Sequence, residues 1–331
     1  MALQEPLLMR PSPKSKIWGG DHLAGCMGLD FTDQGPIGEV WTVADRMDAS
    51  TEVAAGTFAG RRLSGLMLSE RLALLGRSKA TPEEAFPLLV KLIDASRDLS
   101  VQVHPDARRA DLLGEGAEPK DEFWYILDAE PNARIYLGLR EGVDAVTFAA
   151  RAASADVAEL LQEYPVQRGD SVLVPAGTVH SIGAGITLVE IQQNSDTTYR
   201  IYDWGRRGLD GQPREVHIDK ALQSIDFETP AEGPYRPEPQ EDGINPRTLL
   251  VDRPQFAVEH LSVHAPLEHD TAGRAWVYLA LSGRATLVCE EVEGEWTVCR
   301  GETWLMPASL GRYRFHSPDG NFKLLRVEAK A

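Results

Sequence analysis

Short runs rich in Val, Ile, Leu, Trp and Tyr alternate with Gly and Pro along most of this chain. This alternation is typical of an all-β sandwich or barrel, because Gly and Pro end strands and make the turns between them. The clearest predicted strands are LVKLIDA, SVQVHP, EFWYIL, ARIYLGL, DSVLVP and ITLVEIQQ. Helical periodicity is the minority pattern and predicts helices only at Leu63 to Leu75 and Val143 to Tyr164.

The 331 residues are enough to form two hydrophobic cores. A stretch from Phe227 to Arg247 is rich in Pro and Glu and lacks a sustained apolar period, which is typical of a connection between domains. Strand-like runs resume after it, in AWVYLALSGRATLVCEEV, EWTVCRGETWLMPA and NFKLLRVEA. We therefore expect a mainly β chain of two domains, 1–230 and 231–331, with a minor helical portion in the first.

The segment with the most specific spacing is GDSVLVPAGTVH, residues 169–180. Gly169 predicts a tight turn before an apolar strand, and Pro175 with Gly177 predicts a corner that turns His180 into the mouth of a barrel. This order of Gly, Pro, Gly and His resembles the second consensus motif of the cupin barrels. The resemblance implies two cupin, or jelly-roll, barrels.

Three more side chains can join His180. Gln102 and His104 are two residues apart in SVQVHP, so on a strand both face the same side, and Glu122 shares a strand face with Lys120. Two imidazoles, one carboxylate and one amide oxygen suit zinc and leave room for water or substrate. The alternative is a surface turn containing His104 and a solvated Glu122.

A further block, ITLVEIQQNSDTTYRIYDWGR, places Glu190, Asp196 and Arg200 in one predicted strand and its following loop. Glu190 lies on the opposite strand face from Val189 and Ile191, so it points inward, where a carboxylate must be paired, ligated or catalytic. Arg200 can clamp a phosphate or a sugar oxygen with its fixed fork of donors, although an arginine on a surface strand is as often an ion-pair partner.

These motifs together resemble the type I mannose-6-phosphate isomerases in their short bacterial form. The resemblance rests on FPLLVKLIDASRDLSVQVHPD, KDEFWYIL and GTVHSIGAGITLVEIQQNSDTTYRIYDWGR, and on the earlier KIWGG and GEVW. It implies interconversion of mannose 6-phosphate and fructose 6-phosphate through an enediolate. It also implies one divalent metal ion per chain, with zinc as the first choice and other divalent metals as alternatives. It implies metal ligands at Gln102, His104, Glu122 and His180, substrate contacts at Lys91, Lys120 and Arg200, and catalytic roles for Arg200, Glu190, Lys120 and Asp196.

The second predicted barrel repeats the motif only in part, in GETWLMPASLGRY. Ser309 replaces the second glycine, and Arg312 takes the place of the ligand histidine in this spacing. We expect a degenerate cupin without metal. The histidines at 260, 264 and 269 lie in a polar stretch that does not favour a second metal site.

Composition narrows the partners. A formal net charge of −16 argues against nucleic acid and anionic membranes, but it allows a small sugar phosphate held by a few converging basic groups. Three cysteines without a CxxC pair favour free thiols over a disulfide framework, although Cys289 could bridge Cys299. No signal peptide or long apolar segment is evident, so we expect a cytoplasmic monomer or homodimer.

Two other functions compete with isomerisation. A non-catalytic sugar-binding cupin with the same metal would bind hexose phosphates without exchanging the proton on carbon 2. An iron-dependent cupin dioxygenase would consume oxygen, but such sites usually have two or three histidines and an open face for oxygen, whereas this set has only two histidines and Gln102.

Overall fold

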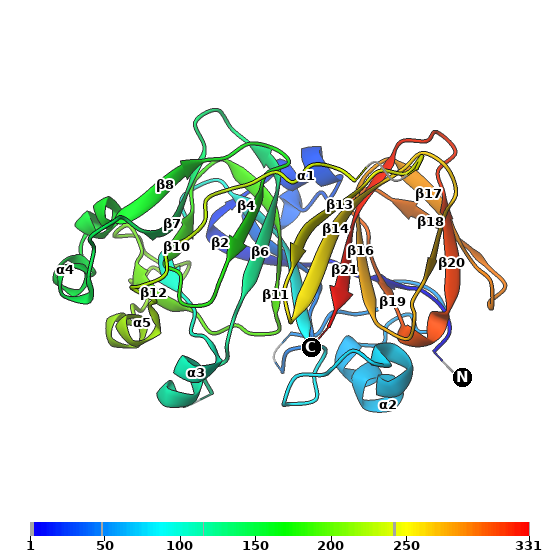
Figure 1. The fold of residues 1–331 in the computed structure, drawn as a ribbon, viewed down its shortest axis with the longest axis horizontal. Coiled ribbons are helices and arrows are strands. Elements are labelled where there is room, and N and C mark those ends of the chain that lie inside the picture. The colour runs from blue at the N-terminus through cyan, green and yellow to red at the C-terminus, as the bar shows by residue number, and fades with distance from the viewer. Residues whose placement is uncertain (1–2, 48, 115, 241–242, 331) are drawn as a thin grey trace.

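The strands of the computed structural model form two antiparallel barrels that lie side by side (Figure 1), as the alternation of apolar runs with Gly and Pro predicts. The structure describes residues 3–47, 49–114, 116–240 and 243–330. The predicted mainly β fold is confirmed, and each of the predicted strands corresponds to one or two observed strands.

The first barrel pairs a six-stranded sheet with a five-stranded sheet. In spatial order the six-stranded sheet contains β2 (Ser12–Gly20), β3 (Ile37–Val43), β4 (Leu88–Ala95), β11 (Ile186–Gln193), β6 (Glu122–Ala129) and β9 (Ser171–Val174). The five-stranded sheet contains β12 (Tyr199–Tyr202), β5 (Val101–Val103), β10 (His180–Ile182), β7 (Arg134–Leu139) and β8 (Leu161–Pro165).

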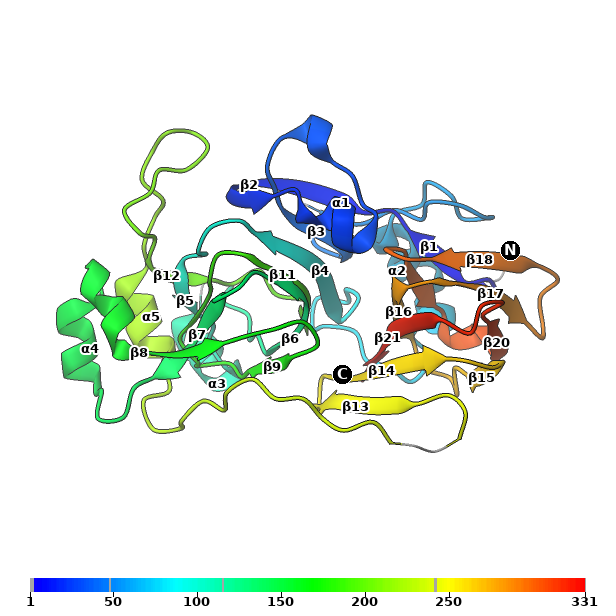
Figure 2. The same ribbon diagram turned by 90° about the horizontal axis from the view of Figure 1, so that it is seen from above.

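The second barrel combines a six-stranded sheet with a four-stranded sheet. The larger sheet contains β1 (Leu7–Met9), β19 (Thr303–Met306), β16 (Trp276–Ser282), β21 (Phe322–Ala329), β14 (Phe256–Val263) and β13 (Arg247–Asp252). The smaller contains β15 (Leu267–Asp270), β20 (Arg312–His316), β17 (Arg284–Cys289) and β18 (Glu295–Cys299). Strand β1, from the start of the chain, therefore completes the barrel that the end of the chain builds (Figure 2).

The alternation of side chains along β4 and β11 decides what faces the first barrel's interior. Val90, Leu92, Val189 and Ile191 belong to a core that also contains residues of β14, β16 and β21, so one face of this sheet packs against the second barrel. The residues between them, including Glu190, point the other way. The two sheets thus share a dry core, and the opposite face of β4 and β11 is free to carry polar groups.

Helices occupy the ends and flanks of the barrels. They are α1 (His22–Met27), α2 (Leu63–Leu75), α3 (Ala107–Leu113), α4 (Ala145–Arg151) and α5 (Ile218–Ser224), with 3-10 turns η1 (Thr32–Gln34), η2 (Ala155–Leu160) and η3 (Ala308–Leu310). The helix predicted at 63–75 is confirmed. No helix long and apolar enough to span a membrane occurs in the described part of the chain.

The helix predicted from Val143 to Tyr164 is wrong as one element. The segment divides into α4, η2 and strand β8, and Val146, expected on the apolar face, is exposed. In the later part, Val157, Leu160 and Leu161 are buried, in a cluster with α5 and β5. Sheet pairing of β8 with β7 outweighs the weak helical period there.

The glycines of the 169–180 motif adopt the backbone conformation that the sequence predicts. Gly169 has φ of +90° and Gly177 of +91°, in the region that a side chain disfavours. A Cβ on Gly177 would also lie 3.1 Å from the Asp226 Cβ. The tight corner places His180 at the first position of β10.

Candidate metal centre and cavity

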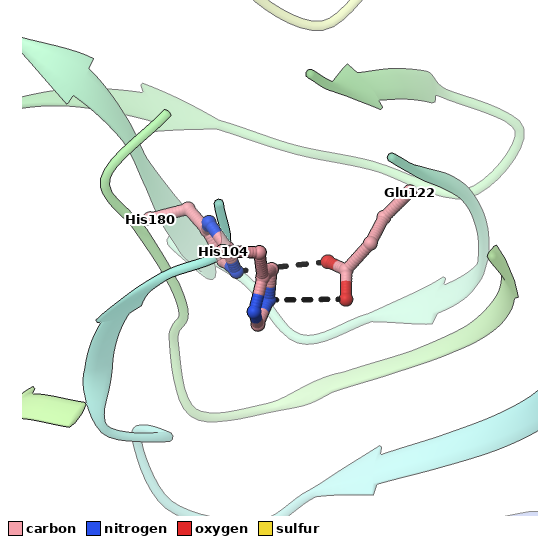
Figure 3. A group of neighbouring side chains, drawn as sticks. All are labelled: His104, Glu122 and His180. Carbon is pink, nitrogen blue, oxygen red and sulfur yellow. Dashed lines mark ion pairs between the residues drawn. The ribbon is translucent and has the colours of Figure 1, made fainter. Parts of the chain in front are cut away.

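Three predicted ligands meet inside the first barrel, where Figure 3 shows them pointing toward one another. His104 Nε2 lies 3.2 Å from Glu122 Oε1, and His180 Nε2 lies 3.6 Å from Glu122 Oε2. The imidazole rings are 4.9 Å apart between centroids. The ligand atoms of all three residues lie within 4.8 Å of one another, so this group could hold one metal ion.

Both histidines are oriented by backbone carbonyl groups. His104 Nδ1 lies 2.7 Å from the Thr197 carbonyl oxygen, and His180 Nδ1 lies 2.8 Å from that of Thr178. A carbonyl oxygen can only accept a hydrogen bond, so each Nδ1 carries the proton and donates it. Each Nε2 then keeps its lone pair, directed at Glu122, which is the arrangement a metal requires.

Burial and charge keep these ligands in the protonation states that a cation needs. Burial, with the Lys120 ammonium, lowers the pKa of His104 to about 3, and burial lowers the pKa of His180. Burial alone would raise the pKa of Glu122, but Lys120, His104 and His180 outweigh it and hold that pKa well below its usual range. Neutral imidazoles therefore face an ionised carboxylate at pH 7.

The Glu122 carboxylate oxygens lack well-directed hydrogen bonds and could bind a cation. It is fully buried, and neither oxygen accepts a well-directed hydrogen bond from the described residues, although the Lys120 Nζ lies 2.6 Å from Oε1. A buried carboxylate whose hydrogen-bonding capacity is only partly met is costly, so a bound cation would stabilise this arrangement. The residues present fit a divalent ion that prefers nitrogen and oxygen ligands.

Gln102, the fourth predicted ligand, lies beside this group. It pairs with His180 across β5 and β10, and its Nε2 lies 3.2 Å from His180 Nε2. The amide nitrogen, rather than the predicted amide oxygen, faces the imidazole in this orientation. A half-turn of the amide exchanges the two atoms without moving the side chain.

Lys91 and Glu190 form a buried ion pair on the same sheet as Glu122. Lys91 Nζ donates to Glu190 Oε2 at 2.8 Å and to Gln192 Oε1 at 2.7 Å. Burial, reinforced by the neighbouring Glu122 charge, raises the pKa of Glu190 despite its lysine partner. Burial opposes the charge of Lys91, but Glu190 and Glu39 raise its pKa. The pKa of the Glu190 carboxyl group therefore lies closer to neutral pH than that of an exposed glutamate.

A cavity of about 260 Å³ adjoins the candidate metal centre. It brings together Lys91, Gln102, Lys120, Glu190, Asp196 and Arg200 from the predicted set. Five basic and three acidic side chains line it, in a chain whose net charge is strongly negative. Such a cavity attracts a small anion.

Arg200 and Asp196 lie in the wall of this cavity rather than in the metal cluster. Arg200 pairs with Gln102 across β12 and β5, and its Nη1 donates to the Glu215 carbonyl oxygen at 2.7 Å. Its buried Nε has no hydrogen-bond partner among the described residues, which leaves a donor for a ligand. Asp196 is exposed, in the loop between β11 and β12.

Several lining residues were absent from the predicted set. Lys16, Trp18, Glu39, Ser100 and Arg214 contribute to the same cavity. The alternation of Lys16 and Trp18 along one strand face was available from the sequence, but their distance along the chain from the other motifs gave no reason to combine them. Arg214 lies in a loop without a repeating pattern, where it forms an ion pair with Asp203 at 3.2 Å.

The second barrel carries aromatic rings where the first carries ligands. Trp276 pairs with Met306 before Pro307, as Glu122 pairs with Val174 before Pro175. Tyr313 pairs with His269, as His180 pairs with Gln102.

The sequence spacing predicts Arg312 at the position of the ligand histidine, but in the structure Tyr313 occupies that position. Arg312 is exposed and lies 3.1 Å from Glu290, because the 3-10 turn η3 adds one residue to the corner and brings Tyr313 inside. His269 contacts the buried Arg326, while burial lowers the pKa of His260 to about 4.

Comparisons with known proteins agree on one family. The family model described as phosphomannose isomerase type I, catalytic domain, matches residues 7–134. The mannose-6-phosphate isomerase of Streptococcus mutans is 34% identical over 326 residues, covering 98% of both chains. The probable mannose-6-phosphate isomerase GmuF of Bacillus subtilis is 33% identical over 311 residues, covering 94% of this chain and 96% of GmuF.

Solved structures extend the similarity to the fold. The crystal structure of the mannose 6-phosphate isomerase from Bacillus subtilis superposes with a TM-score of 0.87 at 28% identity, covering 98% of this chain and 99% of that one. A variant of the phosphomannose isomerase from Salmonella typhimurium superposes with a TM-score of 0.79 at 17% identity, a likeness of fold.

Proposed function

Because this chain belongs to the type I phosphomannose isomerase family, an aldose–ketose isomerase family, we propose that it interconverts mannose 6-phosphate and fructose 6-phosphate. The observation that carries this proposal is the junction of a buried His–Glu–His cluster with a cationic cavity. Lys120 and Gln102 belong to both, since they line the cavity and contact Glu122 and His180 respectively.

Zinc is the ion we propose for the cluster, held by His104, Glu122, His180 and Gln102, the last through its amide oxygen after the half-turn. Neutral imidazoles with carboxylate and amide oxygens suit zinc, and a four-ligand set of this kind can admit a substrate oxygen or water. When bound, the ion would supply positive charge to an oxygen of the open-chain sugar, acting as a Lewis acid.

We assign the substrate's phosphate and hydroxyl oxygens to the basic wall of the cavity. Arg200 offers its unbonded Nε, and Lys120 lies between the cluster and the cavity. Lys91, held by Glu190, is a further phosphate contact. An anionic substrate in this position would be retained by several charge-assisted hydrogen bonds, which fix the reacting carbons relative to the acid–base group.

Glu190 is the proton carrier we favour over Asp196. Moving a proton between carbons 1 and 2 through an enediolate needs a base whose pKa lies near the working pH. Glu190 is buried and its pKa is raised, whereas Asp196 is exposed on the loop. Lys91, which also donates a hydrogen bond to Gln192, holds the carboxyl group in one position during the transfer.

The remaining expectations are part of the same proposal. Residues 1–230 would form the catalytic domain, apart from the contribution of β1 to the other barrel, and residues 231–331 a smaller cupin without metal. The buried Tyr313 and the half-buried Trp276 at the corresponding places of the second barrel support the latter. The three free cysteines are compatible with a cytoplasmic enzyme, a monomer or homodimer.

A coupled assay of mannose 6-phosphate conversion tests the proposal. The purified protein should be active, lose activity on chelator treatment and regain it when zinc is restored. Exchange of the carbon-2 proton with solvent separates an isomerase from a sugar-binding cupin, because binding alone leaves this proton in place. Metal-loaded protein that binds the substrate but shows neither conversion nor exchange would refute the assignment.

A further inference from the structure

A second cavity, of about 340 Å³, lies at the start of β2. Figure 2 shows β2 and β3 (blue) at the outer edge of the first barrel, and β2 is the last strand of its sheet. The lining residues are Arg10, Pro11, Ser12, Pro13, Lys14, Trp41, Ala44, Ala49, Ser50, Thr51, Glu52 and Arg62. None of them lines the cavity beside the metal centre, so the two cavities are separate.

The charges of this cavity are unbalanced. It contains three cations but one carboxylate, Glu52, whose Oε1 lies 3.6 Å from Arg62 Nε. Neither Arg10 nor Lys14 forms a side-chain ion pair or hydrogen bond with another described residue. Acidic residues exceed basic ones by 16 in this chain, so a cavity wall with two cations that no carboxylate pairs with reverses the overall charge locally and attracts an anion.

Hydroxyl groups add neutral donors between the cations. Ser50 Oγ accepts a hydrogen bond from Ser64 N at 2.9 Å, which leaves its own hydrogen for an incoming acceptor. Ser12 lines the same wall, one residue from each proline. Guanidinium, ammonium and hydroxyl donors facing one space are the groups that hold a phosphate.

We propose that this cavity is a second anion site, which binds the phosphate group of a small phosphorylated molecule at Arg10 and Lys14. Its volume accommodates a ligand larger than phosphate alone. The proposal concerns residues outside the catalytic cavity and does not depend on the reaction assigned to that cavity.

Trp41 connects this site with the catalytic cavity. Across neighbouring strands of one sheet, Ser12 pairs with Trp41, Trp41 with Lys91, and Lys91 with Glu190. Lys14 Nζ lies 5.2 Å from the centre of the Trp41 ring, and Lys91 Nζ lies 5.7 Å from it. Both ammonium groups are thus attracted to one ring.

An anion at Lys14 would compete with the ring for this ammonium group. The Trp41 indole, which also donates to Glu39 Oε2 at 2.8 Å, would then interact with Lys91 and Glu39 alone. Both of those residues line the catalytic cavity. Occupancy of the second site should therefore change the fluorescence of Trp41 and the KM of the catalytic site.

Titration with inorganic phosphate, followed by tryptophan fluorescence, tests the site. The wild type should give a saturable change that Trp41→Phe removes. The double variant Arg10→Ala/Lys14→Ala should bind phosphate about tenfold more weakly or not at all. Arg284→Ala/Arg314→Ala removes the same charge from the second barrel and should behave as the wild type, with circular dichroism checking that each variant is folded.

The Arg200→Ala variant separates the two cavities, because its altered wall belongs only to the catalytic one. It should keep the fluorescence change. The same titration with sorbitol 6-phosphate, which cannot be isomerised, tells whether a sugar phosphate binds here more tightly than free phosphate. No saturable change in the wild type, an unaltered change in Arg10→Ala/Lys14→Ala, or its loss in Arg200→Ala would overturn the proposal.

Discussion

The buried pair of Lys91 and Glu190 should respond differently to the loss of each partner. Their side chains are 5% and 6% exposed, with 2.8 Å between Nζ and Oε2. In Glu190→Gln we expect the ammonium group to stay charged, because Glu39 still raises the pKa of Lys91 against the effect of burial. Removing one partner of a buried pair costs about 3–5 kcal/mol of the free energy of unfolding, and this cost should be the same at pH 5.5 and 7.

In Lys91→Met the group left without its partner is the Glu190 carboxyl group, which can take up a proton. Its pKa in the unfolded chain is near 4.5, the folded pKa is already raised, and loss of the ammonium raises it further. The folded state then binds the proton that the unfolded state releases. The cost therefore rises with pH above the unfolded pKa, by at most about 1.4 kcal/mol per pH unit, and should be larger at pH 7 than at pH 5.5.

Urea denaturation of the wild type, both single variants and Lys91→Met/Glu190→Gln, at the two pH values, measures these costs. The double variant should recover much of the stability, because neither charge is left unpaired, but its turnover should stay about 10²–10⁴-fold low, because the proton carrier is absent. An equal cost of Lys91→Met at both pH values would refute the proton uptake. Restored turnover in the double variant would refute the catalytic role of Glu190.

Three further outcomes follow from the structure. Arg200→Ala should greatly lower turnover while the zinc content, measured by mass spectrometry, stays at the wild-type level, because Arg200 lies in the wall and not in the cluster; unchanged turnover would remove it from the mechanism. Metal-free protein should lose stability as pH falls from 6.5 toward 4, since burial lowers the pKa of His260 to about 4 and of His269 to about 3 while the unfolded chain takes up both protons. Urea midpoints that stay level over this range would contradict it. Tyr278→Phe should cost about 1–3 kcal/mol in urea, because the buried Tyr313 hydroxyl, 2.6 Å away, loses its partner, whereas a large loss of isomerase activity would contradict our separation of the second barrel from catalysis.

Local rules were sufficient to predict the core of the site. Alternation along a strand places Glu190 opposite Val189 and Ile191, and the glycine corner places His180, without knowledge of any contact. Convergence of His104, Glu122 and His180 was predicted from strand alternation, from the 169–180 motif and from the family resemblance. The family resemblance is confirmed by relatives that match nearly the whole chain.

The features that sequence patterns did not predict depend on contacts between residues far apart along the chain. Lys16 lines the cavity because β2 is the edge strand of a sheet in which all strands beyond β3 come from much later segments. Likewise, β1 joins the second barrel through pairing with β19, and no local signal specifies such a partner. The misplaced Arg312 shows the limit of spacing arguments, since one extra residue in η3 changes which side chain faces inward.

The most direct test of the central claim is a crystal structure of the purified protein with diffraction data collected on both sides of the zinc absorption edge. The account predicts one anomalous peak per chain, about 2.0–2.2 Å from Nε2 of His104 and His180 and from a Glu122 oxygen. An active enzyme with no metal peak among these three side chains, or with its metal elsewhere, would contradict the account.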